Sequence, residues 1–402
     1  MAGTIQRDVT AGLDIGTSGI AVAVLNRGCG PKPEPLGYGF CPSMGVEKGR
    51  VIDPEDTATA VKKAVNDARV AAGVPFSSVY VNVDGPDIVA RNDSVKQAIA
   101  RRQVIERHDL HKLQLHFCET ILPANWSVVQ LVNIKFYIDG KHVTRPQGCR
   151  GRELGLSATV LAIPSKQMDQ ICQCLRNVDL QVNQTAVGPL AAAQAVLSGV
   201  ERQLGVICVD IGAGLTKTVF INHDMLYHLS IFPVGAGHIT ADLAVGLHTS
   251  LEAAEKVKME YGLGVINGHV QVPNLSGAGY NTVPGELVHK IIRSRIEEIL
   301  DFVKQFIEKL KLEASLPGGI VLTGGGARLV GLPELAQDYW MIPVRRGYNM
   351  LLGEDVSDNE NAYRYTTAVG LALGGTGQRQ VTCGVRRIVE GGLVGRFKSW
   401  LR

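Results

Sequence analysis

Two stretches of the chain share one pattern of apolar and polar positions: an apolar run, a turn of small residues and a second apolar run. The first is AGLDIGTSGIAVAVL, which begins at Ala11, and the second is LGVICVDIGAGLTKTVFI, which begins at Leu204. Short apolar runs bounded by glycine predict strands. Because the two stretches share Asp-Ile-Gly and begin almost half the chain apart, they predict two domains built on one plan.

A third glycine turn and a long helix are predicted in the second half of the chain. The stretch GGIVLTGGGARLVGLPEL, which begins at Gly318, predicts a strand, a turn and a helix. Residues 285–312 predict an amphipathic helix, for which Pro284 suits the start and Pro317 the stop. Its apolar positions are Leu287, Ile291, Ile292, Ile296, Ile299, Leu300, Val303, Phe306, Ile307 and Leu310.

The segment between the two repeats has strand-like and helix-like runs of its own. Residues 127–138 and 154–163 predict strands, and residues 107–116 predict a helix rich in histidine. Two of the histidines have i,i+3 spacing, but no nearby carboxylate clearly completes a metal site. We interpret as surface side chains the histidines of this helix, which are His108, His111 and His116.

Composition places the chain among globular proteins, because apolar residues make up 45% of its 402 residues and charged residues 20%. The net charge is +3, and the last 22 residues contain five basic residues and one acidic residue. The basic character therefore belongs to the C-terminal segment. It predicts one local anionic partner and argues against a broad nucleic-acid surface.

The cysteines and the N-terminus favour a reducing cytoplasm. The eight cysteines are scattered, and none has the C-x-x-C spacing of a zinc site. Cys172 and Cys174 lie two positions apart on a predicted helix, so we expect them to point to different faces. The sequence MAGTIQRDVT has no apolar signal region, and no run of about 18 apolar residues occurs.

The three glycine turns together predict a nucleotide site. A tight turn of small residues lets backbone N–H groups approach phosphate oxygens without interference from Cβ atoms, and Thr17 and Ser18 add hydroxyl donors. Asp14 and Asp210 end their strands at the first two turns, where a carboxylate can hold a hydrated Mg²⁺. The third turn, GGG from Gly324, lets a flat base or ribose lie against bare backbone. One such turn alone would suggest only a hairpin.

These turns resemble the two phosphate loops and the adenosine loop of the actin, Hsp70 and sugar-kinase superfamily. Within it, the chain resembles the bacterial cell-division family FtsA over nearly its whole length. The combination of motifs is specific, although each motif alone is modest. The matching motifs are GRVID at 49–53, SSVYVNV at 77–83, FYIDG at 136–140, RPQGCRG at 145–151, PVGAGHITADLA at 233–244 and AEKVK at 254–258.

The resemblance implies an α/β fold of the actin-like (ribonuclease H-like) type, a two-domain ATPase fold with four subdomains that include an FtsA-type inserted subdomain. The implied divisions are 1–83 and 164–204 for subdomain 1A, 84–163 for the inserted subdomain 1C, 205–229 and 317–376 for subdomain 2A, 230–316 for subdomain 2B, 377–390 for a flexible linker and 391–402 for a C-terminal amphipathic helix.

The resemblance also implies which residues contact ATP and Mg²⁺. Glu255 and Lys258 share one helix face, and in relatives this pair reaches the ribose hydroxyls and the adenine plane; a plain surface ion pair is the alternative. Arg293 and Arg295 lie near the start of the long helix, in the subdomain that receives the FtsZ C-terminal tail in this family, or they form a solvated basic edge. The expected nucleotide-binding residues are Asp14, Gly16, Thr17, Ser18, Gly212, Ala213, Gly214, Leu215, Thr216, Glu255, Lys258, Gly324, Gly325, Gly326 and Ala327, and the expected Mg²⁺ residues, acting through water, are Asp14 and Asp210.

Several departures from the family pattern bear on hydrolysis. Relatives with strong ATPase activity place Glu or Gln just before a proline to orient the attacking water, whereas here Gly188 precedes Pro189. In the second phosphate loop, Ala213, Leu215 and Lys217 replace Gly, Thr and Asp. Lys217 would face either a phosphate or a subdomain interface. We expect ATP binding with weak or no ATPase activity and assign no catalytic residue.

The final twelve residues, GGLVGRFKSWLR, predict a membrane-targeting helix. At 1.5 Å per residue it would be roughly 18 Å long, too short to span a bilayer core of about 30 Å, so it would lie in the interface. A helix docked on the protein is the alternative. Several copies on a filament would bind the membrane by avidity. The expected membrane-binding residues are the apolar stripe Leu393, Val394, Phe397, Trp400 and Leu401 and the basic Arg396 and Lys398.

The resemblance implies a peripheral membrane adaptor of bacterial cell division. It would self-associate into actin-like filaments and tether FtsZ polymers to anionic lipids on the cytoplasmic face of the membrane at the septum. The inserted subdomain would contact neighbouring copies or later division proteins, and no nucleic-acid partner is expected.

Three alternatives remain. A PilM-like cytoplasmic adaptor of type IV pilus assembly would not be expected to carry such a C-terminal segment. A small-molecule kinase would need an acidic base in the first domain, where no acid is an obvious candidate. A scaffold that has lost its nucleotide stays possible because the second phosphate loop is altered.

Overall fold

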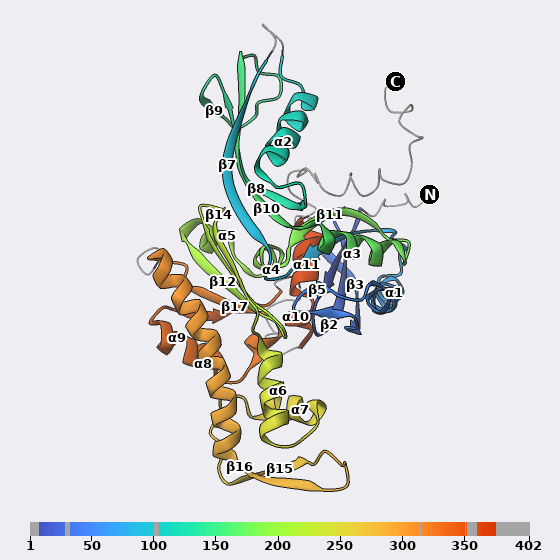
Figure 1. The fold of residues 1–402 in the computed structure, drawn as a ribbon, viewed down its shortest axis with the longest axis vertical. Coiled ribbons are helices and arrows are strands. Elements are labelled where there is room, and N and C mark those ends of the chain that lie inside the picture. Colours follow the sequence, from blue (N-terminus) through green and yellow to red (C-terminus); the bar gives the residue numbers. More distant parts are fainter. Residues whose placement is uncertain are drawn as a thin grey trace, which may run out of the picture.

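The computed structural model describes residues 8–28, 33–99, 104–312, 316–349, 351 and 360–374, and the structural statements below concern these residues. The molecule is elongated (Figure 1). A sheet with one helix lies at one end, two larger sheets lie in the middle, and a mainly helical unit lies at the other end. The predicted linker and C-terminal helix lie outside the described residues.

The two central sheets have the same topology. In each, a central strand has an antiparallel hairpin on one side and two parallel strands on the other. The first sheet has the order β11 (Gln181–Val187), β6 (Ser78–Val83), β1 (Val9–Ile15), β2 (Gly19–Asn26), β3 (Glu34–Pro42). The second has the order β18 (Val344–Arg346), β17 (Ile320–Thr323), β12 (Val206–Ile211), β13 (Thr216–Asn222), β14 (Met225–Phe232). The sequence repeat thus corresponds to a repeat of sheet topology. We call the parts built on these sheets the first and second halves.

Glycines in the first sheet let helices pack closely on both of its faces. Gly39 of β3 faces α1 (Pro54–Ala72), and Gly12 of β1 faces α11 (Thr366–Gly374); at both positions a Cβ atom would lie under 3.0 Å from helix backbone. The strand register places these two glycines on opposite faces of the sheet. Residues from the C-terminal part of the described chain therefore complete the core of the first half.

The inserted part is an antiparallel sheet covered by one helix. Its strand order is β7 (Val89–Ala98), β10 (Glu153–Pro164), β8 (Trp126–Ile138), β9 (Lys141–Val143), and its helix is α2 (Arg107–Ile121). The two strands and the helix predicted here are confirmed. Leu113 and Phe117 of α2 are fully buried against the sheet, whereas His108 and His116 are exposed. Within the described ranges, no group of three or more His, Cys, Asp or Glu side chains is arranged to hold a metal ion.

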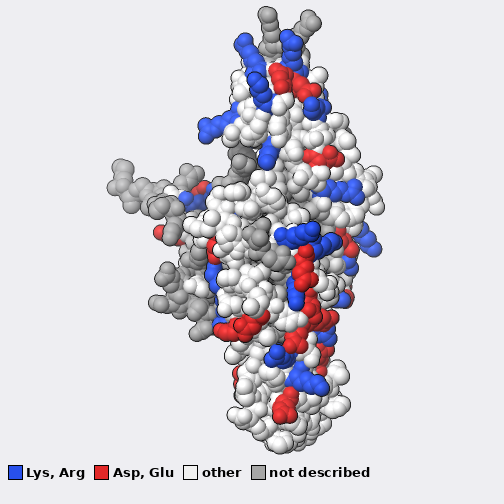
Figure 2. Space-filling view, turned by 90° about the vertical axis from the view of Figure 1, so that its left-hand side faces the viewer, with Lys and Arg blue, Asp and Glu red and all other residues white. Residues whose placement is uncertain are grey.

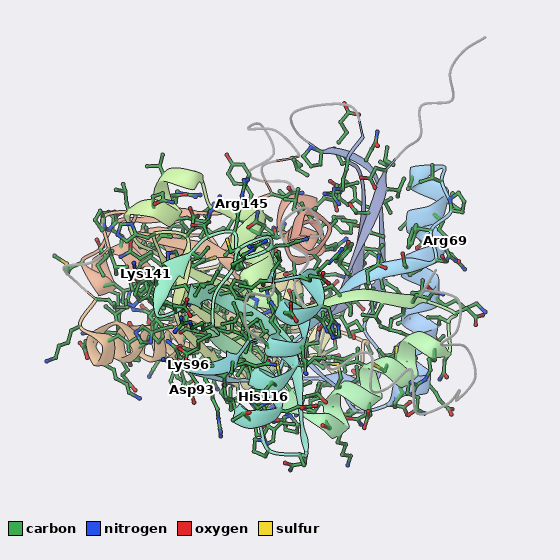
Figure 3. The ribbon with its side chains drawn as sticks, turned by 90° about the horizontal axis from the view of Figure 1, so that it is seen from above. Arg69, Asp93, Lys96, His116, Lys141 and Arg145 are labelled. Carbon is green, nitrogen blue, oxygen red and sulfur yellow. The ribbon has the colours of Figure 1, made fainter. Side chains whose placement is uncertain are left out.

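The far end of the inserted part is rich in basic side chains, as Figure 2 shows for one face. In the view from this end (Figure 3), Lys96 of β7, Lys141 of β9 and His116 of α2 are labelled on the inserted part, and Arg69 of α1 lies to one side.

The opposite end is built around the long helix predicted from the sequence. This helix, α8 (Gly285–Leu310), ends two residues before the predicted end at residue 312, because Lys311 adopts a left-handed conformation (φ 51°) and caps it. Its apolar stripe is buried, apart from Leu287, which is 38% exposed, and the partly buried Ile291 and Leu310. The other elements of this unit are α6 (Ala236–Gly246), α7 (Leu251–Tyr261), β15 (His269–Pro273) and β16 (Tyr280–Pro284).

Short elements connect these parts. They are β4 (Val46–Glu47), β5 (Arg50–Val51), α3 (Ser165–Arg176), α4 (Gly188–Val196), α5 (Gly199–Leu204), a 3₁₀ turn (Gly325–Arg328), α9 (Leu332–Trp340) and α10 (Glu360–Arg364). Cys172 and Cys174 lie on α3, and both are buried. None of the described cysteines forms a disulfide bond. None of the described helices combines the length and apolar character needed to cross a membrane.

Candidate functional site

A cavity of about 430 Å³ lies where the two halves meet, and all three glycine turns border it. This volume falls in the range of small-molecule sites. Most of the residues predicted to bind a nucleotide line the cavity. They are Asp14, Gly16, Thr17, Ser18, Gly212, Ala213, Leu215, Glu255, Lys258, Gly324, Gly325 and Gly326. Sequence positions more than 300 residues apart thus converge on one concave surface.

Three predicted residues do not line the cavity. Thr216 and Ala327 are fully buried, and Gly214 is buried against the Thr17 side chain. The side chains of Thr216 and Ala327 are buried in the core and do not face the cavity, so their role as nucleotide-binding residues stays a prediction. They support the turns from behind.

The first two turns have the same backbone construction. The N–H of Gly16 donates to the carbonyl of Gly19 (3.1 Å), and the N–H of Gly212 donates to the carbonyl of Leu215 (2.9 Å). The two residues inside each turn lie outside the strand ladders. Such turns can present backbone N–H groups to an anion, and two of them on one cavity can hold a chain of phosphates.

The two turns touch each other across the cleft. A Cβ atom at Gly214 would lie 2.9 Å from Thr17 Oγ1, and Thr17 Oγ1 accepts a hydrogen bond from the N–H of Gly49 (3.1 Å). Leu215, which replaces the family threonine, packs on Gly49. Gly49 has a positive φ of 73° in the β4–β5 turn, so another residue there would be strained as well as crowded.

The third turn lies directly against the second. Gly324 has a φ of 81°, and a Cβ atom there would collide with the Asp210 carboxylate and the Ile211 carbonyl. Gly326 is similarly close to Ile211, whereas a Cβ atom at Gly325 would meet nothing within 4 Å. The turn is therefore a bare backbone surface that faces the cavity, a shape that fits a flat base or ribose.

Glu255 and Lys258 form a partly buried pair at the rim of the cavity. Lys258 Nζ lies 2.6 Å from Glu255 Oε2 and also donates to Thr240 Oγ1 (3.0 Å) and the Ala236 carbonyl (3.3 Å). The Lys258 side chain is only 7% exposed, but that of Glu255 is 47% exposed. Burial lowers the pKa of Lys258, with Glu255 acting in the opposite direction. This pair is more than a surface ion pair, because its lysine is held inside the cleft wall.

A chain of polar side chains crosses the floor of the cleft. Asn82 Nδ2 donates to Asp14 Oδ1 (2.7 Å) and to Asp84 Oδ2 (3.0 Å). Lys217 Nζ then lies 3.1 Å from Asp84 Oδ2 and 2.7 Å from Asp210 Oδ2. Asp84 follows β6 in the first half, whereas Asp210 and Lys217 belong to the second half. Lys217 therefore lies at an interface between the halves, one of the two places expected for it.

Burial and the neighbouring charges together set the protonation of these polar side chains. Burial raises the pKa of Asp14 to about 7, although Lys217 acts against it. Burial alone would lower the pKa of Lys217, but Asp210, Asp84 and Asp14 together outweigh it and hold the pKa above its usual value. Lys217 is therefore a permanent cation.

Gly188 has a structural reason to lack a side chain. It begins α4, and its N–H donates to Asp84 Oδ1 (3.1 Å). A Cβ atom at this position would lie 2.4 Å from Asp84 Oδ2 and 2.5 Å from Oδ1. The Asp84 carboxylate caps α4 and fills the space in which a side chain at position 188 would begin. A water-orienting Glu or Gln is therefore excluded here.

The residues present fit a nucleotide but do not fit the predicted Mg²⁺ at Asp210. Mg²⁺ binds oxygen ligands at 2.0–2.1 Å in a near-octahedral shell and keeps several waters. Here the Lys217 ammonium group already contacts Asp210 and Asp84. A dication beside Asp210 would lie close to this fixed positive charge, so the expected metal role of Asp210 is not supported by its surroundings.

Arg293 and Arg295 both lie on α8 and both have acidic partners. Arg295 Nε is 2.7 Å from Asp242 Oδ2, and its guanidinium also contacts Glu298. Arg293 Nε is 2.8 Å from Glu297 Oε1, and its side chain is 49% exposed. Arg295 thus joins α6 to α8, whereas Arg293 is the more accessible of the two.

Sequence reasoning missed Asn82 and Asp84. Both lie at the end of the apolar strand β6, which pairs in parallel with β1, so their side chains come beside Asp14. The signal was available, because polar residues directly after a buried strand often mark the site edge of a parallel sheet.

Comparisons with known proteins agree on one family and one fold. The profile of the family described as Cell division protein FtsA matches residues 207–370. Cell division protein FtsA of Pseudomonas aeruginosa is 29% identical over 383 residues, which cover 93% of this chain and 91% of that protein. Cell division protein FtsA of Escherichia coli K12 is 29% identical over 416 residues, which cover 99% of this chain and 98% of that protein.

Solved structures give the fold. The PilM–PilN type IV pilus biogenesis complex contains a chain with a TM-score of 0.65 at 19% identity, covering 92% of this chain and 99% of that one. MreB5 of Spiroplasma citri bound to ADP has a TM-score of 0.55 at 13% identity, covering 96% of this chain and 100% of that one. At these identities the likeness shows the fold alone, which is actin-like, as the sequence predicted.

Proposed function

We propose that this chain, which is similar to FtsA cell-division proteins over nearly its whole length and has an actin-like fold, is an ATP-binding adaptor that ties FtsZ polymers to the cytoplasmic membrane. The observation that carries the proposal is the similarity to FtsA over nearly the whole chain. The match to the Escherichia coli protein covers 99% of this chain, so it includes the inserted part and most of the C-terminal segment.

The central cleft would be the nucleotide site. The turns at Thr17 and Ala213 would hold the phosphates, the turn at Gly325 would lie against the adenosine, and Glu255 would reach the ribose. The bound nucleotide would link the two halves, since its phosphates would lie between turns that belong to different halves. We expect weak or no hydrolysis, because the position that orients water in active relatives is Gly188 and the space beside it holds Asp84.

The FtsZ tail would bind at the end of the molecule that contains α6 and α8. A groove there is lined by Leu287 and Ile291, by the exposed Lys290, and by Arg295 with its acidic partners Asp242 and Glu298. The apolar side chains and Lys290 suit a short peptide that carries both apolar and acidic residues, which would compete with Asp242 and Glu298 for Arg295. Arg293, on the same helix, is accessible enough to add a further contact.

The C-terminal segment, outside the described residues, would be the anchor. Self-association would align many such anchors on one membrane, so that weak single contacts become strong together. The inserted part, with its exposed strand β7 and basic end, would contact neighbouring copies or later division proteins.

A PilM-like adaptor is the second candidate, and the observation that favours it is the TM-score of 0.65. Membrane binding through the C-terminal segment separates the two candidates, because a PilM-like adaptor would not be expected to have it.

Sedimentation with anionic vesicles tests the anchor. Trp400→Glu places a charge on the apolar stripe, and Ser399→Glu places the same charge beside it. We expect the full chain and Ser399→Glu to pellet with vesicles, and Trp400→Glu to remain in the supernatant. Equal pelleting of both variants would remove the stripe, and with it the anchor, from the proposal.

A further inference from the structure

Lys217 places a fixed positive charge at the point where the two halves meet. Its ammonium group contacts Asp210 in its own hairpin and Asp84 in the other half, and none of the three side chains is more than 10% exposed. Two of its three N–H donors point at these carboxylates. The lysine nevertheless borders the cavity, together with Asp84 and Asp210. It is therefore held rigidly and still faces the space between the two phosphate turns.

The matching hairpin of the first half lacks this charge. In the β1–β2 ladder Asp14 lies opposite Ala21, whereas in the β12–β13 ladder Asp210 lies opposite Lys217. Both Ala21 and Lys217 line the cavity. The two halves thus share one backbone plan, and only the second half adds a cation to it. Because the ammonium also reaches Asp84, it is more than a local cross-strand partner.

We propose that Lys217 takes the place of the divalent cation in this cleft, so that the site binds nucleoside polyphosphates without Mg²⁺. The proposal rests on the nucleotide binding proposed above and specifies the charge state of its ligand. A lysine ammonium is a compact charge that binds phosphate directly. A dication beside Asp210 would be repelled by it at short range. The Oδ2 atoms of Asp84 and Asp210 already contact this ammonium group, so a cation of the chain itself occupies the position between the two carboxylates.

The fixed cation also lowers the repulsion that a polyphosphate would meet. Without Lys217, Asp84 and Asp210 would face the phosphates with unbalanced negative charge, and a bound metal would be needed to offset it. The Lys217 ammonium group offsets this negative charge, so the protein itself supplies the positive charge that a metal would otherwise provide. Replacing the lysine should therefore create a requirement for metal that the natural protein lacks.

The test is ATP affinity with and without metal. The affinity of the full chain for ATP is measured by isothermal titration calorimetry in Mg²⁺ and again in EDTA, for the natural protein, Lys217→Asp and Lys217→Met. Lys96→Met is the matched control, because Lys96 is 66% exposed in the inserted part and pairs only with Glu153 among the ion pairs of the described residues. Circular dichroism checks that each variant is folded. If Lys217→Asp does not fold, Lys217→Met alone provides the test.

We expect the natural protein and Lys96→Met to bind ATP in EDTA within about threefold of their affinity in Mg²⁺. Lys217→Asp and Lys217→Met should lose about tenfold or more in EDTA and regain most of it in Mg²⁺. A lysine with only a structural role would weaken binding equally in both buffers, which would overturn the inference.

Two other results are also decisive. If the natural protein binds ATP only in Mg²⁺, the metal-free site is refuted while the proposed nucleotide binding stands. If it binds ATP in neither buffer, the nucleotide part of the proposed function fails, and this inference fails with it.

Discussion

The contact between Gly188 and Asp84 predicts that Gly188→Ala lowers the free energy of unfolding only when the Asp84 carboxylate is present. Gly188→Ala adds a methyl group 2.4–2.5 Å from the two Asp84 carboxylate oxygens, whereas contacts under 3.0 Å are essentially never seen for real Cβ atoms. The carboxylate must move, and its bonds to the Gly188 N–H, Asn82 and Lys217 are then weakened. Each hydrogen bond to a charged group contributes about 1.5–3 kcal/mol.

Two effects therefore compete. Weakening these bonds costs about 2–4 kcal/mol, and alanine in place of glycine in a helix returns about 0.5–1 kcal/mol. Gly188 does not have a positive φ, so alanine at this position adds no backbone strain. We expect a net destabilisation of about 1–3 kcal/mol for Gly188→Ala, measured by urea unfolding with circular dichroism.

The same substitution in an Asp84→Ala background should be neutral or stabilising, because no carboxylate remains to be displaced. Gly199→Ala is the matched control: Gly199 also begins a helix, and a Cβ atom there meets nothing within 4 Å. It should be neutral or slightly stabilising. The reasoning is refuted if Gly188→Ala costs the same free energy of unfolding with and without the Asp84 carboxylate.

Three further predictions concern packing, the ligand and the thiols. Gly370→Ala forces a methyl group into the α4 backbone and should lower the free energy of unfolding by about 3 kcal/mol or more. Gly374→Ala, where a Cβ atom would meet nothing within 4 Å, should leave it unchanged, and thermal unfolding compares the two variants. Lys258→Met should weaken ATP binding about tenfold in calorimetry because it removes a cation from the cleft wall, and unchanged affinity would place the ligand elsewhere. In the native protein, maleimide at pH 8 should modify the half-buried Cys149 more than about tenfold faster than Cys208, because burial raises the pKa of Cys208. Peptide mass spectrometry follows both rates, and equal rates would contradict the packing of β12.

The features that the sequence predicted well are local. An Asp-Ile-Gly turn between two apolar runs is a hairpin whatever surrounds it, and the turns at Gly16 and Gly212 have matching hydrogen bonds. The long helix α8 was likewise evident, because its apolar spacing is a property of one segment. Its observed end, Leu310, lies two residues before the predicted end at residue 312, because the left-handed Lys311 stops the helix.

The features that the sequence could not give are contacts between distant segments. Asp84 meets Lys217 across 133 positions of the chain, and Gly188 is opposite Asp84 across 104. Strand pairing and the packing of the two halves determine these contacts, and the apolar periodicity of a single segment cannot predict them. Lys217 was recognised as a departure from the family pattern, but its two carboxylate partners, and hence its effect on a metal, required the fold.

The central claim is that the chain links FtsZ polymers to membrane, and a three-component sedimentation tests it most directly. FtsZ polymers are mixed with anionic vesicles and ATP, together with either the full chain or a chain ending at residue 390. We predict that FtsZ pellets with the vesicles only when the full chain is present. If FtsZ is recruited equally by the shortened chain, or stays in solution while the full chain itself pellets with the vesicles, the account is contradicted.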